Sequence, residues 1–452
     1  MLPVVNKNLI FPILEHLRQE PISACLSNLQ VSQWYSTLDL KQLQLKKLSM
    51  LLRHCNDHVP YYKKVFDSLS MHPEDFKSLQ DLERFPYLTK EIISAEKQSI
   101  LAINYNNRTE NCHSGGTQGI PLNLIRDSLS SAYARGALYR CLSWYGINIG
   151  DKQLRVWGVP LDHKMSKIEQ RKDFLLNRMR ISAFDISNSK ILYHYKTIIN
   201  FRPKYIYGYV SGIYRLCRLM NEEKLDGVKL GIRFVVTTAE YLDDFQRNFI
   251  EKFLNCRVIN EYGCGEIGPI AHECPSGHMH INMENVLVEF IPSDCLGEGN
   301  YDIVLTNLNS FSMPLLRYKI KDVGKPDLSF CECGRGLQIM KFESGRVVST
   351  LVSTDGRFVA GNFFRYLASD FSKQNSGIKD FRVVQKAINK IEITLSKDKT
   401  FSQRVLNFFS EKVRDMLGKD MQIEYIFVDE IPLEKSGKRL YVYSELRSIL
   451  ER

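Results

Sequence analysis

The sequence predicts an α/β fold with a large N-terminal domain, part of it rich in β-strand, and a small α+β domain at the C-terminus. Strand-like and helix-like segments alternate between residues 154 and 305, which is the pattern of an α/β protein. Near the C-terminus a helical segment lies between strand-like ones. The chain has 452 residues, too many for one ordinary core. We therefore expect two domains, residues 1–344 and 345–452, with the boundary near Gly345-Arg346.

The N-terminal segment, up to about residue 110, is predicted to be mostly helical. Its clearest stripe is formed by four leucines at helical spacing, and Pro60 interrupts it: Leu43, Leu48, Leu51 and Leu52. A second strong helical pattern covers residues 128–146. This helix follows a glycine-rich segment, and a glycine loop that leads into a helix N-terminus is favourable for binding phosphate.

The central and C-terminal elements follow in order. Three strands are expected in the α/β part: Leu154–Trp157, Arg233–Thr237 and Arg257–Ile259. A helix over Tyr241–Leu254 separates the last two strands, and two β-rich segments follow, Val286–Ile291 and Tyr301–Leu305. The small domain is expected to have strands near residues 380–395 and 422–428 with a helix over about 401–417.

Composition excludes several classes of function. The net charge is +10, but no block of consecutive basic residues indicates a nucleic-acid partner, so we interpret the excess as a solvated surface. No run of about 18 apolar residues predicts a membrane span. The N-terminus lacks the pattern of a signal peptide, which predicts a cytoplasmic location. The 11 cysteines are therefore expected to be free thiols or metal ligands.

The most informative segment is the loop Ser114-Gly115-Gly116-Thr117-Gln118-Gly119-Ile120-Pro121. Its glycines let backbone N–H groups turn toward an anion, and Ser114 and Thr117 add hydroxyl donors. This is what the phosphates of a nucleoside triphosphate require. The loop is not a Walker loop, because no Gly-Lys-Ser/Thr ends it, and taken alone it is a weak motif for which a polar surface loop is the better interpretation.

A second segment, Asn260-Glu261-Tyr262-Gly263-Cys264-Gly265-Glu266, follows a β-branched strand. It should lie at the carboxyl end of that strand, where open α/β sheets bind ligands. Tyr262 can stack on a purine, and Glu266 is a hard oxygen ligand that suits Mg²⁺ on a triphosphate. The alternative is a turn whose carboxylate faces solvent.

Two more segments carry charged side chains. In Met313–Asp322, the Asp322 carboxylate can accept bonds from ribose hydroxyls, or it can form a structural ion pair with Arg317. In Ser436-Gly437-Lys438-Arg439, Lys438 can neutralise charge that develops on an α-phosphate. Taken alone, Lys438 would be an ordinary surface lysine.

These segments resemble, in order and spacing, the motifs of the adenylate-forming superfamily. They are most similar to its phenylacetate–CoA ligase branch, which includes the CapK-type proteins of polysaccharide gene clusters. Further similar segments are Asn56–Tyr62 with Phe85–Lys90, Thr237–Glu240, and Thr306–Leu308 leading into Met313–Tyr318. The resemblance covers about residues 50 to 440, and several motifs in order are specific where one would be weak.

The resemblance implies roles for individual residues. The phosphate loop would be Ser114, Gly115, Gly116, Thr117, Gln118 and Gly119. The adenine and acyl pocket would be lined by Ala239, Glu240 and Tyr262, with Asp322 on the ribose. The cofactor-binding residues would also include Glu261, Gly263 and Arg317. Catalysis would depend on Glu266 as the magnesium ligand, Arg346 at the hinge and Lys438 in adenylation.

The implied reaction uses ATP and Mg²⁺ to convert a carboxylic acid to an acyl-adenylate. The acyl group would then pass to a thiol, with coenzyme A (CoA) as the family default, or to an amine, in surface-polysaccharide assembly. Two departures bear on this. Lys321 stands where the family usually has Gly, and Val347-Val348-Ser349-Thr350 lacks the paired acidic residues usual at the hinge. The altered hinge favours the alternative of a non-catalytic nucleotide-binding scaffold.

Cysteines and histidines also predict a structural zinc site. We favour four ligands: His272, Cys274, Cys331 and Cys333, with His278 or His280 as substitutes for His272. The Cys-x-Cys-Gly-Arg element with an upstream Cys also resembles this family branch. The alternative is that the cysteines are reduced thiols in loops and a histidine lines the acyl pocket. A closed four-ligand site would have no open position for catalysis.

Overall fold

The structure is a computed structural model. It describes residues 2–105, 108–113, 123–158, 163–183, 186–240, 242, 244–292, 301–344, 351–359, 363–364, 367, 377–397, 399–429, 431 and 442–446. The chain forms two compact units: residues 1–114, 122–150 and 260–345 make the first, and residues 115–121, 151–259 and 346–452 make the second. The chain changes from the first unit to the second for the last time between Gly345 and Arg346, close to the domain boundary expected from the sequence. The division into domains 1–344 and 345–452 stays a prediction.

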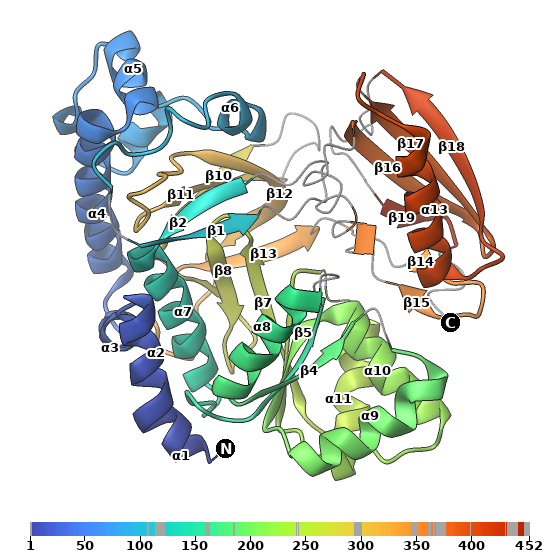
Figure 1. The fold of residues 1–452 in the computed structure, drawn as a ribbon. Helices are drawn as coiled ribbons and strands as arrows, with labels where there is room; N and C mark the ends of the chain where they lie inside the picture. Colours follow the sequence, from blue (N-terminus) through green and yellow to red (C-terminus); the bar gives the residue numbers. More distant parts are fainter. Residues whose placement is uncertain are drawn as a thin grey trace. The chain divides into compact units, whose positions relative to one another are not determined.

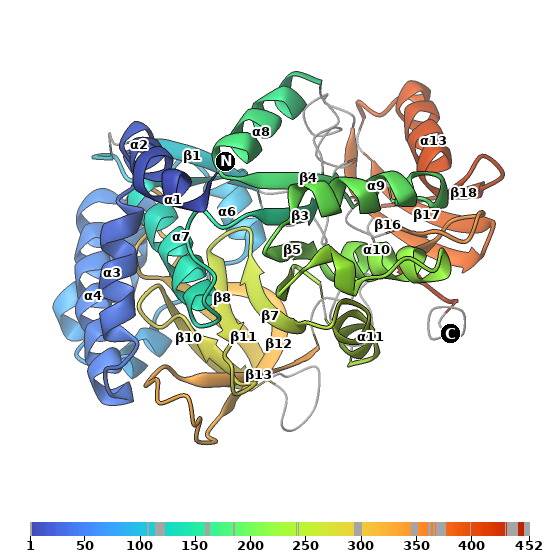
Figure 2. The ribbon, with the colours of Figure 1, turned by 90° about the horizontal axis from the view of Figure 1, so that it is seen from below.

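The first unit begins with helices. They are α1 (Pro3–Val5), η1 (Asn6–Ile10), α2 (Phe11–Arg18), α3 (Ile22–Ser32), α4 (Thr37–His58), α5 (Pro60–Leu69), η2 (Pro73–Asp75), η3 (Gln80–Arg84), α6 (Lys90–Ala95) and, further along, α7 (Ser128–Ser143). The side chains of Ser36, Thr89 and Asp127 cap α4, α6 and α7, which fixes where these helices begin. Helix α3 packs along α7 (Figures 1 and 2).

The sheet of the first unit is antiparallel, with the strand order β10-β11-β12-β13-β9-β8-β7. Its strands are β7 (Arg257–Cys264), β8 (Gly268–Glu273), β9 (Met279–Ile281), β10 (Val286–Pro292), β11 (Tyr301–Asn307), β12 (Tyr318–Asp327) and β13 (Ile339–Ser344). A separate hairpin pairs β1 (Thr109–His113) with β2 (Asn123–Asp127). One face of the large sheet is packed with apolar side chains from the helices and strands, among them Leu40, Leu88 and Ile270.

The second unit contains parallel strands in the order β6-β5-β3-β4. They are β3 (Gln153–Trp157), β4 (Arg178–Ser182), β5 (Tyr205–Tyr209) and β6 (Phe234–Thr238), connected through α8 (His163–Leu175), α9 (Asn188–Phe201), α10 (Val210–Glu222), η4 (Val228–Leu230) and α11 (Asp244–Leu254). Alternate residues of β3 and β5, such as Leu154, Val156 and Ile206, form a core with α9 and α10. The predicted α/β fold is therefore confirmed, although β4 and β5 were not predicted.

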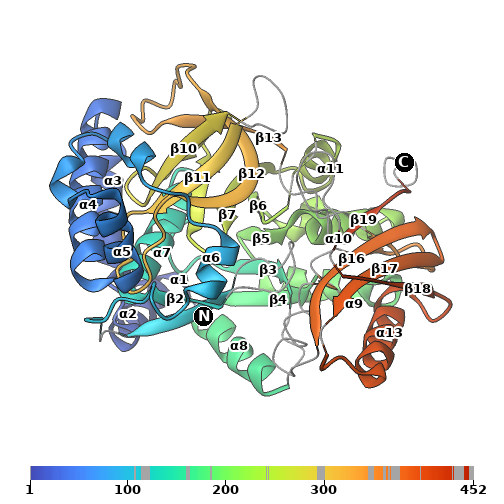
Figure 3. The same ribbon diagram turned by 90° about the horizontal axis from the view of Figure 1, so that it is seen from above.

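The C-terminal part of the second unit has its own core. Strands β16 (Ile378–Ala387), β17 (Lys390–Lys397), β18 (Gln422–Val428) and β19 (Val442–Ser444) form a sheet in the order β18-β17-β16-β19. Helix α13 (Gln403–Leu417) covers it with Leu406, Phe409 and Val413 (Figure 3). A short pair, β14 (Leu351–Val352) with β15 (Phe358–Val359), precedes it. Among the described residues, no helix is both long and apolar enough to cross a membrane.

Candidate functional site

Tyr262 and Asp322 meet in the first unit. Tyr262 lies on β7 and Asp322 on β12, and both side chains are buried. The Tyr262 hydroxyl donates a hydrogen bond to Asp322 Oδ2 at 3.0 Å. This bond holds the Asp322 carboxylate in place, and a carboxylate can accept several hydrogen bonds. The two residues that the sequence placed on the nucleotide side are thus brought together, with a carboxylate suited to ribose hydroxyls.

Glu266 lies in the turn that joins β7 to β8, and its side chain is buried. Its Oε1 accepts a hydrogen bond from the Tyr318 hydroxyl at 3.0 Å, and Lys90 Nζ lies 3.7 Å from the same oxygen. Tyr318 lies four residues before Asp322 on β12. Sequence analysis did not single out Lys90 or Tyr318 as site residues, although both lie in segments that carry the resemblance.

This arrangement fits the groups that the sequence implied. Mg²⁺ is commonly held by one or two carboxylates together with substrate phosphates, and Glu266 is such a carboxylate. Lys90 places a cation beside it, where phosphate oxygens would otherwise be repelled by the carboxylate. The site therefore has an acceptor for hydroxyl groups at Asp322 and a mixed acidic and basic pair at Glu266.

Arg317 has a different environment from the one expected. Its guanidinium forms an ion pair with Glu289, with 2.8 Å from Nη2 to Oε1, and donates to the backbone oxygens of Glu83 and Phe85 at 2.7 Å each. It also lies 4.4 Å above the ring of Tyr87. The alternative of an ion pair with Asp322 was wrong. Through these contacts Arg317 holds residues 83–87 against the sheet, which is a structural role.

Glu261 and Gly263 serve the hairpin that carries Tyr262. Neighbouring side chains on a strand point to opposite faces, so Glu261 points away from the side on which Tyr262 meets Asp322. There its Oε2 lies 2.8 Å from His272 Nε2. A Cβ on Gly263 would lie 2.7 Å from the backbone oxygen of Gly268, so only glycine fits where β7 and β8 approach.

Ala239 and Glu240 follow β6 in the second unit. Ala239 has a φ of 69°, an uncommon left-handed conformation for a residue with a side chain. Glu240 accepts hydrogen bonds from the backbone N–H and the hydroxyl of Ser211 at the start of α10, at 2.7 and 3.0 Å. Burial raises the pKa of the Glu240 carboxyl to about 7 despite these bonds.

Replacing Glu240 by Gln is expected to stabilise the protein at pH 8 but not at pH 4. The folded-state pKa of Glu240 lies above the ordinary value, so its stabilising contribution is present below about pH 4.5 and is lost as the pH rises toward 7. A neutral amide avoids that loss, which we expect to be about 1 to 3 kcal/mol. Thermal unfolding across this pH range measures it, with Glu223→Gln as the exposed control. A gain that is the same at both pH values would contradict the prediction.

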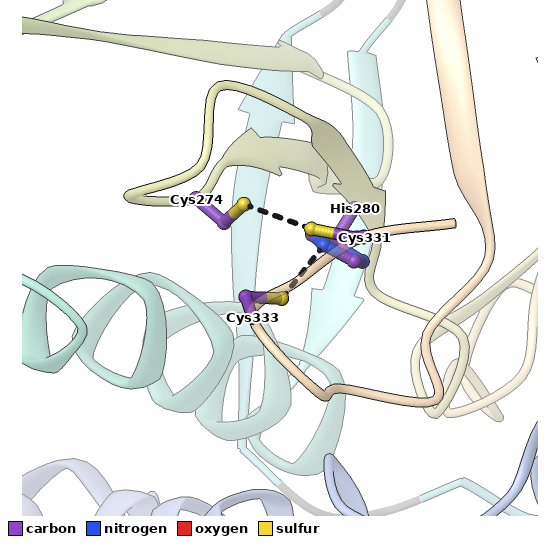
Figure 4. Close-up of side chains that lie close together, drawn as sticks. All are labelled: Cys274, His280, Cys331 and Cys333. Atoms are coloured by element: carbon purple, nitrogen blue, oxygen red, sulfur yellow. Dashed lines mark hydrogen bonds between the residues drawn. The ribbon is translucent and has the colours of Figure 1, made fainter. Parts of the chain in front are cut away.

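Three cysteines and one histidine form a cluster in the first unit (Figure 4). The possible ligand atoms of Cys274, His280, Cys331 and Cys333 all lie within 4.8 Å of one another. The sulfur atoms of Cys274 and Cys331 are 3.6 Å apart, and Cys333 Sγ lies 3.2 Å from His280 Nε2. Around a tetrahedral zinc ion, two thiolates lie about 3.8 Å apart, so the donor set and its spacing fit Zn²⁺.

His280 is prepared to act as a ligand. Its Nδ1 lies 2.9 Å from the backbone oxygen of Leu337, which can only accept, so the proton is on Nδ1 and the Nε2 lone pair faces Cys333. Burial lowers the pKa of His280 to about 4, which keeps the ring neutral. Metal-binding histidines share both features.

His272, which we favoured as the fourth ligand, does not join the cluster. Burial opposes its charging, but Cys141 and Glu261 raise the pKa of His272 to about 10. Its Nε2 lies 2.8 Å from Glu261 Oε2 and its Nδ1 lies 3.5 Å from Asn282 Nδ2, so both ring nitrogens are directed at groups other than the cysteines of the cluster. His280, one of the substitutes considered from the sequence, takes the place beside the three cysteines.

Several predicted site residues lie outside the described residues. They are Ser114, Gly115, Gly116, Thr117, Gln118 and Gly119 of the glycine-rich loop, Arg346 and Val347–Thr350 at the hinge, and Lys438. Their roles stay predictions.

Comparison with known proteins identifies the relatives of this chain. Residues 351–445 match the family model of the CapK C-terminal domain. CapK from Staphylococcus aureus is 22% identical over 426 residues, which cover 90% of each chain. The phenylacetate–coenzyme A ligase of Thermus thermophilus is 25% identical over 319 residues, covering 66% of this chain and 68% of the ligase. This chain is a relative of CapK and of the phenylacetate–coenzyme A ligases.

Solved structures agree with this relationship at the level of the fold. A 2-hydroxyisobutyryl-CoA ligase in complex with 2-HIB-AMP and CoA, in its thioesterification state, has a TM-score of 0.62 at 16% identity, with 93% of each chain covered. The same ligase in the postadenylation state with R3-HIB-AMP has a TM-score of 0.58 at 16% identity, covering 93% of this chain and 92% of the ligase. The fold is therefore that of adenylate-forming CoA ligases, which confirms the resemblance inferred from the motifs.

Proposed function

We propose that this protein is an AMP-forming acid ligase that activates a carboxylic acid with ATP. The observation that carries the proposal is the arrangement around β7 and β12, in which Asp322 is fixed by Tyr262 and Glu266 lies between Tyr318 and Lys90. The relatives whose names state an activity are acid–CoA ligases, which supports the same reaction class.

Each side chain has a task in the proposed first step. Asp322 would accept hydrogen bonds from the ribose hydroxyls, and Tyr262 would hold its carboxylate in place. Glu266 would hold Mg²⁺, whose charge, when bound, offsets that of the triphosphate. The substrate carboxylate then attacks the α-phosphorus of ATP, the bond to the β-phosphate breaks, and pyrophosphate leaves. Lys438 would stabilise the charge that develops on the α-phosphate.

In the second step, the acyl group would pass to an acceptor and release AMP. Coenzyme A is the acceptor we place first, because the ligase relatives are named for it. The relationship to CapK supports the second acceptor inferred from the sequence, an amine in surface-polysaccharide assembly.

The proposed zinc ion would have a structural role. Three cysteines and His280 fill all four positions of a tetrahedral ion and leave none open for a substrate.

Pyrophosphate release from ATP and Mg²⁺ tests the proposal, measured across a panel of aryl, fatty, amino and sugar acids. Release should depend on one class of acid, and Lys438→Ala should lower it by about 100-fold, a loss of a few kcal/mol at the transition state. Silence across the panel with ATP still bound would instead support the non-catalytic scaffold. Acid-dependent release that persists in Lys438→Ala would show that this lysine does not assist adenylation.

A further inference from the structure

One face of the parallel strands in the second unit carries arginines and aromatic rings. Strand β3 lies between β4 and β5, with Arg155 in register with Arg180 on β4 and with Tyr207 on β5. Side chains in register on neighbouring strands point to the same face. The opposite face, with Leu154, Val156 and Ile206, lies in the apolar core, and Tyr209 and Trp157 also take part in that core, whereas Arg155 and Tyr207 do not.

Arg155 lies beside two aromatic rings, Trp157 and Tyr207, which stack on each other with their centres 5.8 Å apart. Its guanidinium carbon lies 4.8 Å from the centre of the Trp157 ring and 5.5 Å from that of Tyr207. Its Nε is buried and has no hydrogen-bond partner within the described part of the chain. Contact with aromatic rings does not use the N–H donors of a guanidinium, which remain to be satisfied by another group.

The nearby carboxylates are already engaged with Arg180. Asp173 binds Arg180 through both oxygens, at 2.6 Å to Nε and 3.0 Å to Nη2, and Glu169 lies 3.1 Å from the same Nη2. Glu169 is also shared with Lys172 at 2.8 Å. The group of side chains around Arg180, here called the arginine cluster, therefore holds more positive charges (Arg155, Arg180 and Lys172) than negative ones (Asp173 and Glu169).

The electrostatic surroundings of Arg155 agree with that excess. Burial, followed by the neighbouring charge of Arg178, lowers the pKa of the Arg155 guanidinium from its ordinary value. The group nevertheless stays protonated at neutral pH. A partly buried cation crowded by other cations is stabilised by any anion that reaches it.

Aromatic contacts and strand pairing connect the arginine cluster to Ala239 and Glu240, the segment that the family resemblance assigns to the acyl side. The Trp157 ring lies 4.2 Å from the ring of Tyr209, centre to centre. Tyr209 is in register with Thr238 on β6, and Ala239 and Glu240 follow at once. Arg155 lies two residues before Trp157 on the same face of β3. The two residues are therefore about 7 Å apart along the strand.

We infer that Arg155, placed against the rings of Trp157 and Tyr207, is an anion-binding subsite, and that the acid substrate carries a second anionic group in addition to the carboxylate that is activated. The inference rests on the proposed function for the identity of the ligand as a substrate. A carboxylate is the best match, because a guanidinium binds it through two parallel hydrogen bonds. The substrate class is thus a dicarboxylic acid. An acid that carries a phosphate group would offer the same anion chemistry, and the test distinguishes the two kinds of acid.

Binding measured by calorimetry tests the subsite without requiring activity. The probes are succinate, glutarate and adipate, each compared with its monomethyl ester, and 3-phosphoglycerate compared with glycerate. We expect the wild type to bind at least one of the doubly charged acids more tightly than its singly charged counterpart by about tenfold or more. Arg155→Met should abolish this preference, Arg155→Lys should retain part of it, and Arg233→Met, an exposed arginine in the same unit, should retain all of it.

The inference is overturned if no doubly charged acid is preferred by the wild type, or if Arg155→Met keeps the preference while its far-ultraviolet circular dichroism is unchanged. Pyrophosphate release with the same acids separates this inference from the proposed function. Arg155-dependent binding without release would sustain the subsite and count against adenylation. Release with singly charged acids that Arg155→Met does not alter would sustain adenylation and overturn the subsite.

Discussion

Glu266→Gln is expected to lower acid-dependent pyrophosphate release by about 10² to 10³-fold, the range found when one group that stabilises transition-state charge is removed. The Glu266 carboxylate is buried and contacts Tyr318 and Lys90. Glutamine has nearly the same shape and can still accept the hydrogen bond from Tyr318. The substitution therefore removes the negative charge that Mg²⁺ prefers while keeping the local packing.

The dependence of the rate on magnesium distinguishes a metal ligand from a structural carboxylate. We expect Glu266→Gln to require a higher Mg²⁺ concentration for half-maximal release, and excess Mg²⁺ to restore part of the rate. Tyr318→Phe removes only the hydroxyl that orients the carboxylate and should cost less. Glu332→Gln, on an exposed residue of the same unit, should leave both quantities unchanged. An unaltered magnesium requirement in Glu266→Gln would show that Glu266 is not the ligand.

Local patterns predicted Tyr262 and Asp322 but not the contacts around them. The β-branched segment before Asn260 predicted a strand with Tyr262 beyond its end, where a nucleotide site is expected. The strand was predicted correctly but too short, because β7 continues through Tyr262 to Cys264. Lys90 reaches Glu266 from the N-terminus of α6, a helix that is distant in sequence. Such a pairing depends on how helices pack on a sheet, which hydrophobic periodicity does not specify.

The choice of histidine for the proposed zinc site shows a second limit of sequence reasoning. His272 and His280 lie directly opposite each other on β8 and β9, and both are close to Cys274 in sequence. The strand order β13-β9-β8-β7 decides between them. His280 lies next to β13, into which the Cys331–Cys333 loop leads, whereas His272 lies next to β7 and bonds to Glu261. Sequence spacing gives the candidates, but only the register of the strands selects one.

We expect the purified protein to contain one zinc ion per chain and Cys333→Ser to lose it. A hydroxyl is a much poorer ligand than a thiolate, and metal-binding free energy contributes directly to folding. The loss should reduce the free energy of unfolding by about 3 kcal/mol or more, as expected when a structural metal is removed. Metal analysis and thermal unfolding of wild type and variant measure the two effects.

The contacts of the metal loop predict where the structure would loosen. Arg335, two residues after Cys333, lies 4.9 Å from the ring of Trp34 and 4.3 Å from that of Trp144. The backbone N–H of Gly336 donates to the Gln33 oxygen at 3.1 Å. These contacts join the loop to the turn between α3 and α4. Metal loss should therefore increase hydrogen exchange in residues 30–37 as well as in residues 331–336.

Matched variants separate metal loss from general damage. His280→Gln should lose zinc as Cys333→Ser does, whereas His272→Gln should keep it, because His272 lies outside the cluster. Cys256→Ser removes a free thiol of the second unit and should keep both zinc and the protection of residues 30–37. Zinc retained at full stoichiometry in both Cys333→Ser and His280→Gln would refute the site. If zinc were lost in His272→Gln but kept in His280→Gln, the fourth ligand would be His272, as first expected from the sequence.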